Sequence, residues 1–354
     1  MDLVNYGLRE RYEQVKKRGD KLDDIKRIID WESLRPLLKD LFTNDTDQGG
    51  RPNYDEILMV KILFLQSIYN IVDESMETEI YDSVRFINFL DYPEKVPDQN
   101  TIWLFRERLS KTGKDKALWK EVWRQFKEKG ITIRNGTIQD ATFIESDPGH
   151  KRRDKPDIVD PQMPPVEAEK DDSTEQEAKD KMKLAEHRYE ERKNSKTRRS
   201  KDGSWTKKNS RSYFGFKLHT IQGMENDMIV NYSMTTASLH DSQIDLSIPG
   251  IVNYKDKGYF SVDGRGIDAT MDRAVRGHEL PIESIRRNLR ITRKRSRGER
   301  PYSVMKRTFR GGHTYVTTVP RVKVKAMFMC LGHNLFNLLS LTRRGKIATA
   351  IVIS

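Results

Sequence analysis

The stretch of sequence that decides the fold reads Gly136-Thr137-Ile138-Gln139-Asp140-Ala141-Thr142-Phe143-Ile144. Its side chains alternate in character, which is typical of a β-strand with one face in the core. Asp140 shares a face with Ile138 and Ile144. A carboxylate among apolar neighbours costs free energy unless a metal ion or a fixed donor meets it. We therefore predict a core strand that carries a candidate functional acid.

The sequence before this strand has a helical pattern. Apolar residues in 55–69 recur at spacings of three and four, and a wide buried stripe follows from them. A cap rich in Asp and Asn at 97–101 precedes a second helix, and a third helix over 116–129 ends at Gly130. Residues 1–130 are predicted to form an all-helical domain.

The sequence after residue 130 predicts an α+β domain, residues 131–354. We expect strands at 131–134, 136–144, 213–221, 228–234 and 251–256, and helices around 269–276, 299–309 and 324–341. The two strands at 213–221 and 228–234 form an antiparallel hairpin around the turn at 223–227. Between the first core strand and this hairpin, about 146–210 is rich in charge and poor in large apolar residues, which predicts a charged, partly disordered insertion.

Composition narrows the class of protein. Lys and Arg number 65 against 53 Asp and Glu, and the net charge of +12 favours a polyanionic partner. One cysteine, Cys330, excludes a disulfide scaffold. We expect no membrane span, because no run of about 20 apolar residues occurs, and no secretory leader. The expectation is a soluble, cytoplasmic protein.

Two further acids stand at the ends of predicted elements. Asp256 closes a short strand, and Glu299 opens a helix because Pro301 fits only a first turn. Lys306 follows Glu299 by seven residues, about two helical turns, and should share its face.

Each of the three acids also has a simpler interpretation. Asp140 would then be a buried acid paired with Arg134 or Lys217, and Asp256 would begin an Asx turn. Glu299 would interact with a helix macrodipole. These alternatives stay open on the residues alone.

One known arrangement unites the three acids. The segments 136–142, 213–219 and 256–259, and then Arg295, Glu299 and Lys306, occur in the order seen in prokaryotic insertion-sequence transposases. The segment 97–106 resembles an N-terminal signature of the same proteins. The chain closely resembles the DDE transposases of the insertion sequence 5 group, within the insertion sequence 4 superfamily. It departs from the pattern at Thr292, where the family usually has a tyrosine.

The resemblance implies an RNase H-like catalytic core, a mixed sheet with flanking helices, behind the helical domain. Asp140, Asp256 and Glu299 would be the catalytic residues and the ligands of two Mg²⁺ ions, for which Mn²⁺ can substitute. Asp140 would bridge both ions, and the other two acids would hold one each. Carboxylate oxygens are what Mg²⁺ prefers, and a pair of such ions activates a nucleophile and neutralises charge at phosphorus.

Other residues are predicted to support this site or to bind DNA. Arg295 and Lys306 would position phosphates, and a dense basic stretch at 286–297 adds Arg290, Arg293 and Lys294. The basic run over 193–208 is either a solvated face or a DNA-contacting arm in which Trp205 stacks on a base.

Two histidine segments are assigned supporting roles near the acids. His219 would support Asp140, or is simply a hydrogen-bonded histidine of the strand. His240 and Asp241 match an "H-D" pair of the family, or mark a helix start that Asp241 caps. None of the three is predicted to be a metal ligand.

The resulting expectation is a DNA transposase that binds the terminal inverted repeats of its element through the helical domain. It would cut the DNA ends and join their 3′-hydroxyls to target DNA by transesterification. Its partner is double-stranded DNA, and a homodimer is expected because two ends must be held at once. We expect it in the cytoplasm, associated with the nucleoid. The alternatives are a catalytically inactive DNA-binding derivative, such as a repressor or degraded copy, and an RNase H-like nuclease without strand transfer.

Overall fold

The computed structural model describes residues 3–42, 52–149, 200, 202–208, 210–260 and 264–345. The chain divides into two compact units, one made of Met1–Thr132 and Met327–Ser354 and the other of Ile133–Ala326. Residues from 327 onward therefore group with the helical unit, although the sequence prediction placed them in the second domain. Most of the predicted insertion at 146–210, including the basic residues at 193–199, lies outside the described residues.

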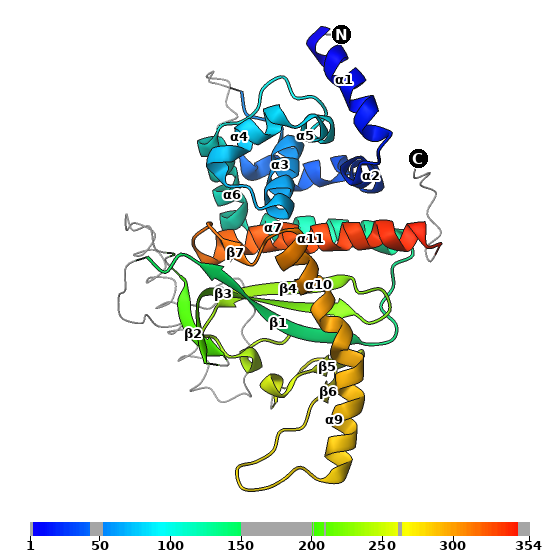
Figure 1. Ribbon diagram of the computed structural model, residues 1–354, viewed down its shortest axis with the longest axis vertical. Helices are drawn as coiled ribbons and strands as arrows, with labels where there is room; N and C mark the ends of the chain where they lie inside the picture. The colour runs from blue at the N-terminus through cyan, green and yellow to red at the C-terminus, as the bar shows by residue number, and fades with distance from the viewer. Residues whose placement is uncertain are drawn as a thin grey trace. The chain divides into compact units, whose positions relative to one another are not determined.

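The first unit is helical throughout its described N-terminal part (Figure 1). Its elements are α1 (Leu3–Lys16), α2 (Lys21–Ile28), η1 (Glu32–Leu37), η2 (Lys39–Leu41), α3 (Glu56–Tyr69), α4 (Asp73–Asp82), α5 (Val84–Phe89), α6 (Gln99–Thr112) and α7 (Lys114–Glu128). The predicted helices at 55–69, 102–109 and 116–129 are confirmed as α3, α6 and α7. The predicted caps also form, since Asp98 accepts a hydrogen bond from the backbone N–H of Thr101 at 2.7 Å.

The helix α3 is the centre of this unit, because nearly all of its side chains are buried. Phe64 on α3 packs against Trp31 and Phe89, with ring centroids 5.7 and 5.8 Å apart. These aromatic contacts explain why the sequence pattern of this helix is apolar on more than one face.

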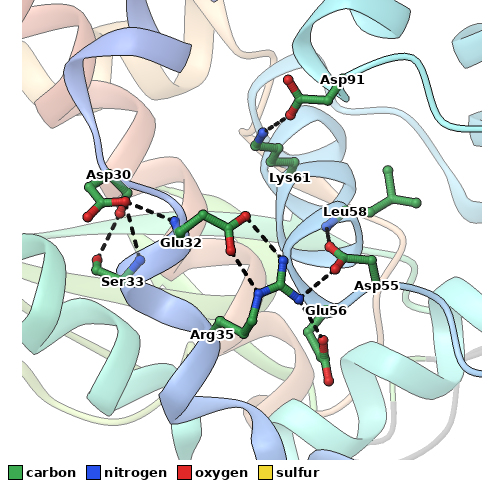
Figure 2. A network of polar contacts seen from close by, with 9 residues as sticks. All are labelled: Asp30, Glu32, Ser33, Arg35, Asp55, Glu56, Leu58, Lys61 and Asp91. Atoms are coloured by element: carbon green, nitrogen blue, oxygen red, sulfur yellow. Dashed lines mark hydrogen bonds and ion pairs between the residues drawn. The ribbon is translucent and has the colours of Figure 1, made fainter. Parts of the chain in front are cut away.

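A polar network fixes the start of α3 against η1 (Figure 2). Arg35 donates hydrogen bonds to Glu32 at 2.8 Å and to Asp55 at 2.5 Å, and Asp55 also caps α3 at the N–H of Leu58. Further along α3, the buried ammonium of Lys61 pairs with Asp91. A buried charge needs such a partner, whereas the exposed pairs of Arg35 act mainly on orientation.

The second unit is built on a mixed β-sheet (Figure 1). Its strands are β1 (Thr137–Ser146), β2 (Ser204–Lys208), β3 (Arg211–Gly223), β4 (Ile229–Thr236), β5 (Val252–Lys255), β6 (Ile267–Thr270) and β7 (His313–Thr314). The order is β2-β3-β1-β5-β6, with β4 paired to β3 and β7 to β1. The pairs β1–β3, β2–β3 and β3–β4 are antiparallel, and β1–β5, β5–β6 and β1–β7 are parallel. The predicted strand at 136–144 and the predicted hairpin are thus confirmed.

Helical segments follow the sheet in the chain. They are η3 (Asp241–Gln243), η4 (Lys257–Tyr259), α9 (Ile282–Arg295), η5 (Ser296–Glu299), α10 (Arg300–Ser303), η6 (Val304–Thr308) and α11 (Val319–Arg343). From α9 to η6 the backbone stays in the right-handed helical region while its hydrogen bonds change type, and η6 is a π-type turn. Glu299 lies within this longer helical run as the N-cap residue of α10, whose first turn holds Pro301, so the predicted helix start at Glu299 is confirmed.

Three sequence predictions of secondary structure were wrong. Residues 131–134 are irregular, because pairing in β1 starts only after Gly136. The segment 269–276 is the end of β6 and a loop, since pairing with β5 overrides its helical pattern. The helix α9 was missed because its apolar residues Ile282, Ile285 and Leu289 are exposed.

The helix α11 is long and apolar enough to cross a membrane by length and composition. However, 83% of its most apolar window is buried in the structure, as in the core helix of a soluble protein. Lys323, His333 and Asn334 are buried along the same helix. Polar and ionisable side chains at these positions suit a protein interior with polar partners better than lipid.

Gly215 allows β3 to lie between β1 and β2, and replacing it should destabilise the sheet. A Cβ at Gly215 would lie 2.3 Å from the carbonyl oxygen of Ile144, and the φ of +144° disfavours other residues. We expect Gly215→Ala to lower the free energy of unfolding by about 3 kcal/mol, measured by urea unfolding. Gly250→Ala is the control, because Gly250 has a φ of +75° but open space around it, and it should lose only about 1 kcal/mol. Equal losses would contradict the steric argument.

Candidate active site

Asp140 lies on β1, and Asp256 directly follows β5, the strand that pairs with β1 in parallel. The register of β1 and β5 pairs Ile138 with Tyr254, and each acid lies two residues further along the chain. Residues paired on neighbouring strands point to the same face of the sheet. The sheet thus brings together two carboxylates that are far apart in the sequence.

Arg295, the last residue of α9, lies against both of these acids. Its Nη2 is 3.6 Å from Asp140 Oδ1, and its Nη1 is 3.9 Å from Asp256 Oδ1. The side chains of Arg295 and Asp140 are 15% and 25% exposed, so these charges are weakly screened by water. One guanidinium therefore balances part of the charge of the two carboxylates.

The pKa of Asp140 is raised from its ordinary value, mainly because burial disfavours the charged carboxylate. The nearby charge of Asp256 raises this pKa further, whereas Arg295 and the backbone N–H of Ala141 oppose the rise. That N–H donates to Asp140 Oδ1 at 2.9 Å. The site therefore holds a carboxylate that would be stabilised by an additional cation.

Asp256 has a second role as the cap of η4. Its Oδ1 accepts a hydrogen bond from the backbone N–H of Lys257. Asp256 can therefore be both a turn residue and a member of the predicted site. Its Oδ1 caps the turn and also faces Arg295.

Glu299 lies on the same helical run as Arg295 but does not join the two aspartates. Its side chain is exposed and makes no hydrogen bond or ion pair with another described residue. Its neighbours hold the backbone on the sheet: a Cβ on Gly298 would lie 2.9 Å from Ile138, and Tyr302 Oη donates to the carbonyl oxygen of Asp140 at 2.6 Å. The Glu299 backbone is thus anchored beside Asp140, while its carboxylate points into solvent.

Lys306 was predicted to share a face with Glu299, but it lies in the π-type turn η6. A π-type turn contains more residues than an α turn, so a spacing of seven no longer equals two regular turns, and the shared face of Glu299 and Lys306 stays a prediction. The pKa of Lys306 is lowered, mainly by desolvation and also by Lys208, while Glu145 raises it. Glu145 and Lys208 are therefore the charged side chains that influence the ammonium of Lys306.

His219 is fully buried in β3 and acts as a neutral hydrogen-bonding residue. Its Nε2 lies 2.9 Å from Thr235 Oγ1. Burial lowers the pKa of His219 to about 3, and Lys217 lowers it as well, whereas Asp241 opposes them. Lys217 and Asp241 form an ion pair at 2.9 Å. His219 pairs with Ala141 next to Asp140 in the sheet, and among the described residues no hydrogen bond or ion pair joins the His219 side chain to the Asp140 carboxylate.

The segment after β4 starts the short helix η3. His240 Nδ1 accepts a hydrogen bond from the backbone N–H of Ser242 at 3.2 Å, which makes His240 the cap. The alternative interpretation, in which Asp241 is the cap, was wrong because the Asp241 carboxylate pairs with Lys217.

Sequence reasoning missed Gln139 and Tyr302. Gln139 is fully buried, donates to the carbonyl oxygen of Ile244 at 2.7 Å and accepts from the N–H of Leu246 at 3.0 Å. It thereby holds the segment before β5 against β1. A polar residue between apolar positions of a strand was the available signal for Gln139, whereas Tyr302 had none.

The basic residues predicted to bind DNA are mostly on the exposed surface of α9. Arg290, Arg293 and Lys294 are exposed, and Lys294 Nζ donates to Tyr254 Oη at 2.7 Å. Trp205 lies elsewhere, on β2, where it is 37% exposed and its ring centroid is 5.3 Å from that of Phe214. Trp205 and the basic surface of α9 therefore come from separate elements.

The donor set fits a hard divalent cation only in part. Asp140 and Asp256 supply oxygen ligands of the kind that Mg²⁺ prefers, and Arg295 lies against both of them. Among the described residues, however, no three His, Cys, Asp or Glu side chains are grouped closely enough to hold a metal ion. Two of the three predicted ligands are together, and Glu299 is not with them.

Asp140 on the mixed sheet is followed in the chain by Asp256, the basic helix α9 and then Glu299, which is the order expected of a DDE transposase. Residues 134–335 match the family model described as "Transposase DDE domain", and residues 9–108 match "Transposase domain (DUF772)". The chain belongs to the Transposase DDE domain family, and it is an insertion-sequence DDE transposase whose family implies an RNase H-like core. No solved structure matches the chain.

In the absence of divalent metal, Asp140→Asn is expected to stabilise the folded protein at neutral pH. Because folding raises the pKa of Asp140, the folded state binds protons more tightly than the unfolded state. The free energy of unfolding therefore falls as the pH rises from the ordinary value of 3.8 through the raised pKa. The variant avoids this loss and should gain about 1 kcal/mol at neutral pH and nothing below pH 3.8, measured by urea unfolding.

Asp268→Asn is the control of opposite sign. Burial raises the pKa of Asp268, but hydrogen bonds from Thr270 and Lys255 outweigh it and hold that pKa below its ordinary value. Ionised Asp268 thus stabilises the fold at neutral pH, and its replacement should lower the free energy of unfolding. A change of the same sign in the free energy of unfolding of both variants at neutral pH would contradict the raised pKa of Asp140.

Proposed function

We propose that this transposase cuts the DNA ends of its insertion sequence by metal-dependent hydrolysis and joins them to target DNA by transesterification. The observation that carries the proposal is that Arg295 lies against both Asp140 on β1 and Asp256, which directly follows the parallel strand β5. Within the wider family, we place the chain in the insertion sequence 5 group of the insertion sequence 4 superfamily.

In both reactions, an oxygen nucleophile attacks phosphorus and a bond from phosphorus to a 3′ oxygen breaks. In the first, a water oxygen bonds to phosphorus, and the bond from phosphorus to the 3′ oxygen breaks, which leaves a 3′-hydroxyl on the element. In the second, that hydroxyl attacks a phosphodiester of the target and displaces its 3′ oxygen. Divalent metal, when bound, supplies charge neutralisation at phosphorus and lowers the pKa of the attacking water or hydroxyl.

The protein residues prepare this chemistry. Asp140 and Asp256 would hold the metal in their ionised forms, with Asp140 shared between two ions. Arg295 would move from balancing these carboxylates to contacting a phosphate once metal has taken over that charge. Glu299 would complete the ligand set from its anchored segment when DNA and metal bind, and Lys306 would contact a phosphate further along.

Double-stranded DNA is the proposed partner, both as element ends and as target. The exposed cations of α9 suit contacts with phosphates, and the helical residues 1–130 would recognise the terminal inverted repeats. His219, His240, Asp241 and Trp205 would support the site or the DNA. We propose a homodimer in the synaptic complex, because two ends must react together, and a cytoplasmic, nucleoid-associated location.

The separation of Glu299 from the two aspartates favours a second candidate, a catalytically inactive DNA-binding derivative. The two candidates differ in one measurable property, which is metal-dependent cleavage of the element's own ends.

Replacement of any one of the three acids should abolish cleavage. We expect Asp140→Asn, Asp256→Asn and Glu299→Gln each to reduce the cleavage rate by at least about a thousandfold. Each substitution removes the charge of one proposed metal ligand, and the metal would then neutralise less charge at the reacting phosphate. Labelled element-end DNA with Mg²⁺ or Mn²⁺ reports both nicks and joined products. Asp272→Asn, an acid paired with Arg287 outside the site, should cleave normally. Wild-type protein that binds these ends without cutting them would establish the inactive candidate instead.

The surface of α9 should contribute to DNA affinity through charge. Arg290→Ala combined with Arg293→Ala should weaken binding to any DNA sequence and reduce the salt slope of the logarithm of the binding constant by about 2. Fluorescence anisotropy over a series of salt concentrations measures both. Arg287→Ala is the matched control on the same helix, because Arg287 is engaged with Thr270 and Asp272. An unchanged slope in the double variant would exclude α9 from the interface.

A further inference from the structure

The turn between β3 and β4 contacts both arginines that flank Glu299. Arg297 Nη2 donates to Asp227 Oδ2 at 3.0 Å, and Arg300 Nη1 donates to the same oxygen at 2.9 Å. Arg297 Nε is also 3.0 Å from Asp227 Oδ1. One carboxylate thus joins the residues on either side of the third acid.

This contact is built into the hairpin. The Asp227 side chain is 13% exposed, and its backbone has a φ of +55°, a left-handed conformation that Asp and Asn adopt more readily than other residues with side chains. The buried Gln222 of β3 adds a second contact, because its Nε2 donates to the carbonyl oxygen of Arg297 at 3.0 Å. The hairpin therefore holds this segment by both side chain and backbone.

A second anchor lies on the other side of Glu299. Tyr302 Oη donates to the carbonyl oxygen of Asp140 and lies 2.7 Å from Thr220 Oγ1. The backbone around Glu299 is therefore held on one side by Asp227 and on the other by Tyr302, which bonds to the backbone of Asp140.

Charge explains why the first anchor matters. Asp227 is the carboxylate that forms ion pairs with both Arg297 and Arg300 among the described residues, and without it their like charges would repel each other on a short helical segment. Glu299 itself contributes no contact that would hold the segment in place. Its distance from Asp140 and Asp256 depends on these neighbours.

We propose that Asp227 is a positioning residue for Glu299, and that it sets the place from which this acid reaches the metal and the scissile phosphate. The inference rests on the proposed function. Asp227 itself does not touch the reacting atoms. A displacement of about 1 Å at a reacting group can cost about a hundredfold in rate.

The test compares two variants in the same turn. Asp227→Asn keeps the shape and the left-handed backbone preference but removes the charge that joins the arginines. Glu225→Gln removes a charge two residues away, where the carboxylate contacts Asn135 and no arginine. Full-length proteins are assayed on element-end DNA over a range of Mn²⁺ concentrations, with wild type and Glu299→Gln in the same series.

We expect Asp227→Asn to lower kcat by about ten- to a hundredfold and to raise the Mn²⁺ concentration for half-maximal cleavage. Its affinity for DNA without metal should stay within about twofold of wild type, a combination that general destabilisation does not produce. Hydrogen exchange should become faster in residues 296–303. Glu225→Gln should match wild type in all of these measurements.

The outcomes separate the two proposals. Cleavage by wild type but not by Glu299→Gln, together with normal cleavage by Asp227→Asn, would overturn the positioning role and leave the function standing. Failure of the wild type to cleave would overturn the function, and the role of Asp227 with it. Should Asp227→Asn not fold, Arg300→Gln removes one partner at a side chain that is 60% exposed. An unchanged Mn²⁺ requirement in that variant would also overturn the positioning role.

Discussion

The arrangement of the site depends on the parallel pairing of β1 with β5. This pairing brings Asp140 near Asp256, which directly follows β5, and a slip of one residue would turn Asp140 to the opposite face of the sheet. Buried Gln139 supports the register, because it bonds to the segment that leads into β5. The polar interior of the sheet therefore specifies which carboxylates meet. Its apolar core, with Ile138 and Ile144, supplies the burial that raises the pKa of Asp140.

Ion pairs join arginines on the helical run from α9 to α10 to acids on the sheet and on the turn between β3 and β4. Arg295 faces the two aspartates, and Arg297 and Arg300 face Asp227 on the next hairpin. Each ion pair holds a different part of one helical run against the sheet. The exposed cations of α9 continue the same run outward. A single stretch of chain thus meets the proposed catalytic carboxylates at one end and carries the proposed DNA-binding surface at the other, in keeping with the transposase family to which the chain belongs.

Local patterns predicted those elements that carry a local signal. The alternation in 136–144 identified β1, and the turn after Gly223 identified the hairpin, because each depends on residues close in sequence. The strand β6 was missed since it exists through pairing with β5, and α9 was missed since Ile282 and Leu289 face solvent. Asp140 and Asp256 could be proposed from their strand positions. The contact of Asp227 with Arg297 spans 70 residues of chain, and no pattern in either segment indicates it.

The placement of the charged segment between β1 and β2 has a consequence for how the chain can vary. Both strands pair with β3, so the ends of this connection are held by the sheet whatever its length. The entropy of closing a connection between two fixed ends grows only with the logarithm of its length, by about 0.6 kcal/mol for each doubling. A change in its length should therefore alter the free energy of folding little, whereas one residue added within β1 or β3 would shift the register. We expect insertions and deletions to be tolerated between β1 and β2 but not within the strand that carries Asp140 or the strand paired with it.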